Sequence, residues 1–272
     1  MDHSLKKHLL LLILVCTITS CASLSPNGVG RVRDYEISSE QLPAEFDGYS
    51  IAFISDIHYP SLFTRSRLAK IVRKLHMTSP DLLLLGGDYV TSDSYIKELF
   101  DSISSIKTTD GIYAVLGNHE RRNKDKIASS MQMHGITLLD DKVVEIRRNG
   151  KPIYIAGILD SFKHDPLVTQ PAETVPDSAY TILVCHTPDY AERSNTTADL
   201  TLSGHTHGGQ VSLFGLYTPV KNTVYGKRFL KGRNKTTSGS TIITTTGVGT
   251  SRKKIRFCVP SELVLIRLYG RK

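Results

Sequence analysis

Seven side chains of the types that bind divalent metals follow short apolar segments of this 272-residue chain. They are two carboxylates, one amide and four imidazoles: Asp56, His58, Asp88, Asn118, His186, His205 and His207. Seven ligands are too many for one tetrahedral zinc ion and suit two metal ions that share a ligand. A carboxylate can bridge two cations through its two oxygens, whereas an imidazole cannot. The bridge is therefore Asp56 or Asp88, and Asp88 is the better candidate because Gly86 and Gly87 permit a close backbone approach.

The segment before Asp88 has the pattern of a deeply buried strand. Four consecutive leucines, Leu82 to Leu85, indicate a strand covered on both faces. Asp88 then lies near the carboxyl end of that strand, where open α/β sheets bind their ligands. Taken alone, Asp88 is better explained as a cap for the segment after it, residues 89–97. The six other residues favour the metal site.

The first half of the chain alternates between strands and amphipathic helices. Strands are predicted at 51–54, 82–85 and 112–116, and helices at 65–76, 94–105 and 124–134. This order predicts a parallel sheet with right-handed crossovers and helices over it. Since parallel strands end at one edge of a sheet, the polar residues after each strand should lie close together.

The second half contains few helical patterns. Residues 142–148 and 153–156 flank Asn149-Gly150, which is typical of a tight hairpin. Further strands are predicted at 181–185, 200–202, 241–246 and 263–268, and an edge strand at 34–42. We expect a second, more antiparallel sheet packed on the first. Residues 160–178 hold three prolines and are predicted to form a loop over the site.

Five short segments resemble, in the family's order, the motifs of the calcineurin-like metallophosphoesterases. They are Asp56-Ile57-His58, Gly87-Asp88, Gly117-Asn118-His119-Glu120, His186 and Gly204-His205-Thr206-His207. The resemblance implies an α/β fold, a four-layer α/β/β/α sandwich of two packed mixed sheets, in a domain of residues 34–272. The strings at 84–90 and 204–210 are most similar to the bacterial membrane-associated branch, which includes phosphodiesterases and UDP-2,3-diacylglucosamine pyrophosphatases.

The resemblance also assigns roles to the residues. It implies that Asp88 bridges two metals, of which one is held by Asp56, His58 and His207 and the other by Asn118, His186 and His205. His119 would give a proton to the leaving oxygen, and Glu120 would orient His119. Mixed nitrogen and oxygen ligands without thiolate suit Mn²⁺, Fe or Zn²⁺, and Mn²⁺ is our first expectation.

The activity implied is hydrolysis of a phosphodiester or pyrophosphate bond by a metal-bridging hydroxide, with His119 as proton donor. Lipid-linked or UDP-linked substrates, such as UDP-2,3-diacylglucosamine in lipid A biosynthesis, follow from the branch resemblance. The alternative is a catalytically inactive metal-binding scaffold or partner-binding module at the membrane.

The N-terminal segment has the features of a bacterial lipoprotein leader. Lys6 and Lys7 precede an apolar run at 9–15 that is too short to cross a bilayer, and Ile18-Thr19-Ser20-Cys21 resembles a lipobox. We expect a signal peptide at 1–21, lipid attachment at Cys21 and a tether at 22–33. The protein would be a membrane-anchored lipoprotein on the extracytoplasmic, periplasmic side of a bacterium. An ordinary secretory signal or an uncleaved anchor is the alternative.

The formal net charge of +8 is concentrated in the C-terminal part of the chain. No acidic residue lies between Asp199 and Glu262, whereas ten basic residues do: Lys221, Lys227, Arg228, Lys231, Arg233, Lys235, Arg252, Lys253, Lys254 and Arg256. This pattern predicts a basic solvated surface, part of which steers an anionic substrate or rests on anionic lipid headgroups. No zinc-finger spacing or RNA-binding aromatic motif occurs, so no nucleic-acid partner is expected.

Two cysteines remain outside the leader. Cys185 and Cys258 both lie in apolar, strand-like sequence. Buried free thiols are the first interpretation, and a disulfide between them is the alternative.

Overall fold

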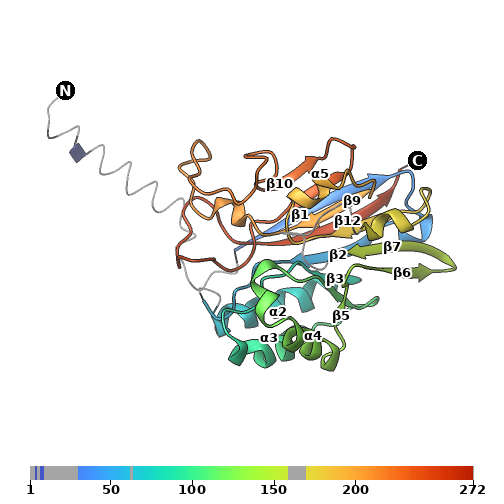
Figure 1. The fold of residues 1–272 in the computed structure, drawn as a ribbon, viewed down its shortest axis with the longest axis horizontal. Helices are drawn as coiled ribbons and strands as arrows, with labels where there is room; N and C mark the ends of the chain where they lie inside the picture. Colours follow the sequence, from blue (N-terminus) through green and yellow to red (C-terminus); the bar gives the residue numbers. More distant parts are fainter. Residues whose placement is uncertain (1–3, 5–6, 9–29, 62–63, 159–169, 272) are drawn as a thin grey trace.

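The computed structural model describes residues 4, 7–8, 30–61, 64–158 and 170–271 (Figure 1). Cys21, nearly all of the expected signal peptide, residues 22–29 of the expected tether and residues 160–169 of the predicted loop at 160–178 lie outside the described residues. The division of the chain at residue 21 therefore stays a prediction, whereas residues 31–33, at the end of the predicted tether, belong to the first strand of the fold, Arg31–Ser39. Among the described residues, no helix combines the length and apolar character that crossing a membrane requires.

The first sheet has six strands, and its central strands run parallel. In spatial order it contains β1 (Arg31–Ser39), β12 (Glu262–Gly270), β2 (Tyr49–Ile54), β3 (Leu82–Leu85), β4 (Ile112–Ala114) and β5 (Thr137–Leu138). Only the β12–β2 pair of this sheet is antiparallel. Three helices pack on its outer face: α2 (Arg65–Thr78), α3 (Ile96–Ser104) and α4 (Lys124–Met133). The predicted β-α alternation is confirmed.

The second sheet also has six strands and is more antiparallel, as predicted. Its spatial order is β10 (Gly232–Lys235), β11 (Thr241–Thr244), β9 (Leu200–Ser203), β8 (Thr181–Val184), β7 (Lys151–Gly157) and β6 (Lys142–Arg148). The β6–β7 hairpin and the β10–β11 pair are antiparallel, and the three pairs between them are parallel.

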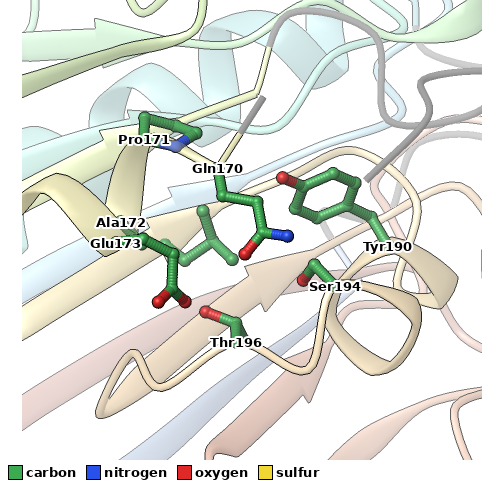
Figure 2. Close-up of a pocket in the computed structure, with 8 residues that line it drawn as sticks. Gln170, Pro171, Ala172, Glu173, Tyr190, Ser194 and Thr196 are labelled. Atoms are coloured by element: carbon green, nitrogen blue, oxygen red, sulfur yellow. The ribbon is translucent and has the colours of Figure 1, made fainter. Parts of the chain in front are cut away.

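The outer layer over the second sheet is thin. Among the described residues it consists of the 3₁₀ helix η4 (Pro171–Thr174), the short helix α5 (Asp189–Arg193) and loops. A narrow crevice lined by Glu173, Tyr190 and Thr196 separates η4 from α5 (Figure 2). The four-layer α/β/β/α sandwich is therefore confirmed, with one full helical layer and one reduced layer.

The four leucines of β3 connect the two halves of the core. Leu82 and Leu84 pack into the layer between the sheets, whereas Leu83 and Leu85 pack against the helices. All four side chains are fully buried. This alternation follows from the two-residue period of a strand, and it fixes the backbone that leads to Asp88.

No disulfide joins the two cysteines outside the leader, which favours the first interpretation over the alternative. Cys185 is buried, and its sulfur lies 3.2 Å from Ser203 Oγ. Cys258 is half-buried rather than buried.

The burial of β3 gives a stability prediction. Leu84→Ala should lower the free energy of unfolding by about 2–5 kcal/mol, because it leaves a cavity between the sheets. Met77→Ala on α2 is the matched control, since Met77 is 81% exposed and its loss should change stability by less than about 0.5 kcal/mol. Urea unfolding measures both variants. Equal effects would contradict the packing described.

Candidate metal centre

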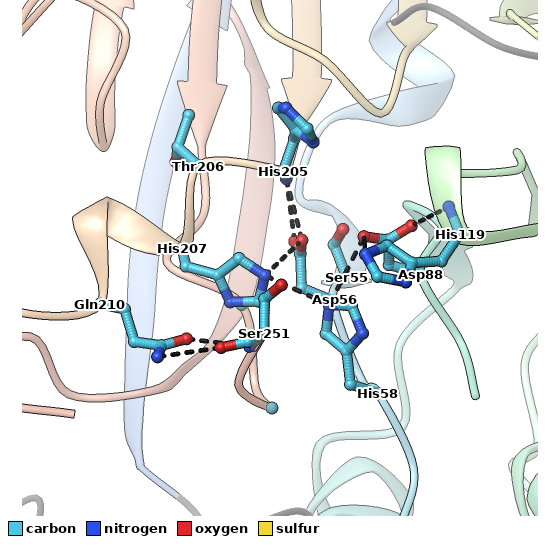
Figure 3. A network of polar contacts seen from close by, with 12 residues as sticks. Ser55, Asp56, His58, Asp88, His119, His205, Thr206, His207, Gln210 and Ser251 are labelled. Atoms are coloured by element: carbon cyan, nitrogen blue, oxygen red, sulfur yellow. Dashed lines mark hydrogen bonds and ion pairs between the residues drawn. The ribbon is translucent and has the colours of Figure 1, made fainter. Parts of the chain in front are cut away.

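The two sheets bring their strand ends to one place. Asp56 and His58 follow β2, Asp88 follows β3, and His119 lies in the 3₁₀ helix η3 (Asn118–Arg122) after β4. His186 follows β8, and the pair His205 and His207 follows β9, with His207 opening the 3₁₀ helix η5 (His207–Gly209). Backbone hydrogen bonds link neighbouring segments, such as His58 N to Asp88 O at 2.9 Å. Figure 3 shows Asp56, His58, Asp88, His119 and His207 lying around one another.

Four of these residues form a compact cluster. The ligating atoms of Asp56, His58, Asp88 and His207 all lie within 4.8 Å of one another. His207 Nε2 is 3.2 Å from His58 Nε2 and 3.3 Å from Asp56 Oδ1. All four side chains are buried. These donors match the geometry needed to hold a divalent cation.

A second group lies on the other side of Asp88. The Oδ2 atom of Asp88 is 3.4 Å from His58 Nε2 in the first group and also 3.4 Å from His186 Nε2 in the second group. His205 Nδ1 lies 3.3 Å from His186 Nε2. His186 Nδ1 donates to Gly86 O at 2.6 Å, so Nε2, which faces Asp88, is the ring nitrogen left to bind a metal.

Asn118 supplies the test of whether a metal fits this second group. Its Oδ1 atom is buried and has no hydrogen-bond partner among the described residues. Such an atom is costly unless something satisfies it. An amide oxygen, two imidazoles and a carboxylate are donors that a divalent cation accepts. The residues present therefore fit a metal ion.

The protonation states also suit metal binding. Burial lowers the pKa of His58 to about 4 and that of His205 to about 3, so both rings are neutral at pH 7. Burial acts to raise the pKa of Asp88, but the neighbouring His186 outweighs it and holds that pKa well below the usual range. Asp88 is therefore ionised beside the neutral ring of His58, which is the form that ligates metals. Burial acts to lower the pKa of His186, but the Asp88 carboxylate outweighs it and raises that pKa to about 10, so His186 must release a proton when its Nε2 binds a metal.

The backbone at the site adopts an unusual conformation. Asp56, His58, Asp88, His205 and His207 have φ between 45° and 69°, the left-handed region. This conformation costs a non-glycine residue about 1–2 kcal/mol. Strain of this kind collects at functional sites, where the surrounding structure enforces it.

Glycines make room for the two carboxylates. A Cβ on Gly117 would lie 2.2 Å from Asp88 Oδ1, and a Cβ on Gly204 would lie 2.3 Å from Asp56 Oδ2. Only glycine fits at either position without displacing a carboxylate.

His119 lies at the mouth of the site. Its side chain is 44% exposed, and its Nε2 is 3.9 Å from Asp88 Oδ2. A cleft of about 600 Å³ opens beside it and is lined by His58 and His119 together with Arg122, Arg252 and Lys254. His119 is therefore accessible to a substrate while the other imidazoles are buried, which agrees with its predicted role.

The predicted role of Glu120 is wrong. Its carboxylate does not orient the His119 ring, because both oxygens accept backbone N–H groups. Oε2 accepts from Asp88 N and Gly117 N, and Oε1 accepts from Tyr89 N, each at 2.8 Å. Burial raises the pKa of Glu120 to about 7. Glu120 thus connects the segment after β3 to the segment after β4 and fixes the backbone of Asp88.

Arg256 does not belong to the predicted basic surface, because its side chain is buried and only 3% exposed. Its guanidinium donates to the carbonyls of Thr246, Gly247, Gly249 and Val259 at 2.6–3.3 Å. The loop so held reaches the site, since Gly249 N donates to Asp56 O at 2.8 Å. In the sequence, Gly247 and Gly249 shortly after the predicted strand at 241–246 are the feature that could have indicated a close approach of this loop to the site.

Comparison with known proteins identifies the family. The family profile of calcineurin-like phosphoesterases matches residues 49–209, more than half of the chain. The chain therefore belongs to the calcineurin-like phosphoesterases and is a hydrolase of phosphoric esters with a divalent metal site. The expectation of an enzyme is confirmed.

Individual relatives are similar over most of their length. The chain is 29% identical to the uncharacterised metallophosphoesterase YkuE of Bacillus subtilis, covering 86% of this chain and 84% of the relative. It is also 29% identical to an uncharacterised metallophosphoesterase of Aquifex aeolicus, with 89% and 92% covered. The solved phosphopantetheinyl hydrolase PptH of Mycobacterium tuberculosis is 13% identical, with a TM-score of 0.47 and 74% and 91% of the two chains covered.

The contacts of Glu120 give a prediction that separates its two roles. Glu120→Gln should lower the free energy of unfolding by about 1–3 kcal/mol, because the amide nitrogen cannot accept from a buried N–H. Glu173→Gln is the matched control, since Glu173 is exposed on η4. Urea unfolding and kcat are measured for both. A loss of kcat at unchanged stability would instead support action through His119.

Proposed function

We propose that this enzyme hydrolyses a phosphodiester or pyrophosphate bond at a centre of two divalent metals that share Asp88. One observation carries the proposal: Asp88 Oδ2 lies 3.4 Å from an imidazole nitrogen of each group, His58 on one side and His186 on the other. A carboxylate so placed has an imidazole ligand donor on either side of it. The family assignment supports the same reading.

Asp56, His58 and His207 would hold one metal, Asn118, His186 and His205 the other, with Asp88 between them. Mn²⁺ is the first choice and Fe or Zn²⁺ the alternatives, because the donors are nitrogen and oxygen without thiolate. When bound, such ions polarise phosphoryl oxygens and lower the pKa of water.

The residues of the cleft perform the remaining tasks. His119 protonates the leaving oxygen from its exposed position above Asp88. Arg122, Arg252 and Lys254 line the cleft beside it and attract the anionic parts of the substrate. Three cationic side chains favour a substrate with more negative charge than a single diester carries, such as a pyrophosphate.

The substrate class follows from the branch resemblance. The strings at 84–90 and 204–210 support a lipid-linked or UDP-linked substrate, such as UDP-2,3-diacylglucosamine in lipid A biosynthesis. The leader supports attachment through lipidated Cys21 on the extracytoplasmic side, with basic residues against the membrane. These two proposals are in tension, because UDP-linked lipid precursors are made at the cytoplasmic face. A body outside the cytoplasm favours another phosphoester.

The role of His119 can be tested by substitution. His119→Ala should lower kcat for an alkyl phosphodiester with Mn²⁺ about 10²–10⁴-fold, because proton transfer to the leaving group is lost, and should lower kcat for bis-p-nitrophenyl phosphate less. His76→Ala is the matched control, since His76 is exposed on α2. The two substrates are assayed in parallel. The smaller effect is expected with bis-p-nitrophenyl phosphate, because its p-nitrophenolate leaving group departs readily without a proton. Full activity of His119→Ala on both substrates would contradict the mechanism.

A further inference from the structure

Exposed large apolar side chains are concentrated in one segment. Nine such side chains occur among the described residues, and two of them, Met77 and Met133, are isolated on helices. The other seven lie within 213–224 or at position 255: Leu213, Phe214, Leu216, Tyr217, Val220, Val224 and Ile255. We call residues 213–224 together with Ile255 the apolar lip. Clusters of this kind mark interaction surfaces rather than ordinary solvated surface.

The lip is an ordered structure. Leu213 N donates to Tyr217 O at 2.8 Å, which closes a tight loop that presents Leu216 at 80% exposure. Ser212 N donates to Phe257 O at 2.9 Å, and the ring of Phe214 packs edge-on against Phe257 at 6.4 Å. In Figure 1 residues 213–224 of the lip belong to the orange loops between β9 and β10, and Ile255 belongs to the segment between β11 and β12. The fold thus holds these side chains in solvent.

Basic residues surround the lip. Lys227 Nζ donates to Leu216 O at 3.0 Å, and Lys253 and Lys254 directly precede Ile255. No acidic residue occurs between Asp199 and Glu262. Apolar side chains interleaved with lysines are the composition of surfaces that insert shallowly into anionic bilayers. An apolar protein partner would not require this surplus of positive charge.

The lip also adjoins the cleft of the enzyme. Gln210, directly after η5, donates from Nε2 to Ser251 O at 3.1 Å and to Lys253 O at 2.8 Å. Figure 3 shows this contact beside His207. Ser251, Arg252 and Lys254 line the cleft on which His119 opens. A bilayer in contact with the lip would therefore lie at the cleft mouth.

We propose that the apolar lip docks onto an anionic phospholipid bilayer and turns the cleft mouth toward it. A phosphoester carried by an amphiphile in that bilayer then reaches His119 without entering bulk water. The docking does not depend on the proposed function. The access of an amphiphilic substrate to the cleft rests on the proposed phosphoester hydrolysis.

The absence of tryptophan from the chain allows a local test of docking. The full chain is prepared as Phe214→Trp and, because Phe214 packs on Phe257, also as Leu216→Trp. Met133→Trp is the matched control, since Met133 is 77% exposed on α4. A single fluorophore reports only its own position, so the readout holds even if the N-terminal segment also binds membranes.

With vesicles of phosphatidylglycerol and phosphatidylethanolamine, both lip variants should shift their emission to the blue and be quenched by brominated lipid, and Met133→Trp should do neither. Vesicles of phosphatidylcholine alone should give a weaker response. Unchanged lip emission would overturn the proposal. So would a blue shift that needs no vesicles and grows with protein concentration, since the occupant would then be a second copy of this chain.

A second measurement separates docking from catalysis. Phe214→Ser combined with Leu216→Ser should lower hydrolysis of an alkyl p-nitrophenyl phosphate embedded in the same vesicles by about tenfold or more. Hydrolysis of soluble bis-p-nitrophenyl phosphate should not change. Equal losses on both substrates would overturn the access role. A wild type inactive on both would refute the proposed function and leave the fluorescence result standing.

Discussion

The burial of Asp88 is the constraint on which the rest of the structure depends. A carboxylate removed from water is stable only where positive charge or hydrogen-bond donors compensate it. Its backbone N is fixed by Glu120, its Oδ1 accepts from His119 N at 3.0 Å, and its Oδ2 faces imidazole nitrogens from both sheets. These contacts require the sheets to meet at the carboxyl ends of β3 and β8. The site therefore forms only when the two sheets pack together as they do in this fold.

Strain and close packing support that arrangement. Five of the seven proposed ligands have left-handed backbone conformations, and Gly117 and Gly204 leave no space for a side chain beside the carboxylates. On the far side of Asp56, the guanidinium of Arg256 holds the loop at 246–249 through its carbonyls. Burial of apolar side chains in the core, where β3 is covered on both faces, offsets the free-energy cost of this strain. A rigid scaffold of this kind keeps the donor atoms at fixed distances from one another.

The sequence was informative where a residue's neighbours along the chain determine its place. Leu82 to Leu85 predicted a doubly buried strand, and ordered motifs at strand ends predicted which side chains converge. Prediction failed where contacts are distant in sequence. Nothing near Glu120 indicates that its carboxylate binds Asp88 N, 32 residues away. Arg256 follows four exposed positions, 252–255, so only the folded loop explains its burial. The apolar lip was missed because scattered Leu, Phe and Val in a loop have no periodic pattern.

The account depends on Asp88 serving two metals at once, and metal content tests this most directly. Elemental analysis of the Mn²⁺-loaded protein should give about two metals per chain in the wild type, and His58→Ala should retain the metal of the group on His186. Asp88→Asn should lose both metals together, because Oδ2 is the atom that faces both groups and the substitution removes the negative charge that both metals would share. Retention of one full equivalent in Asp88→Asn, with the other lost cleanly, would contradict the shared role of Asp88.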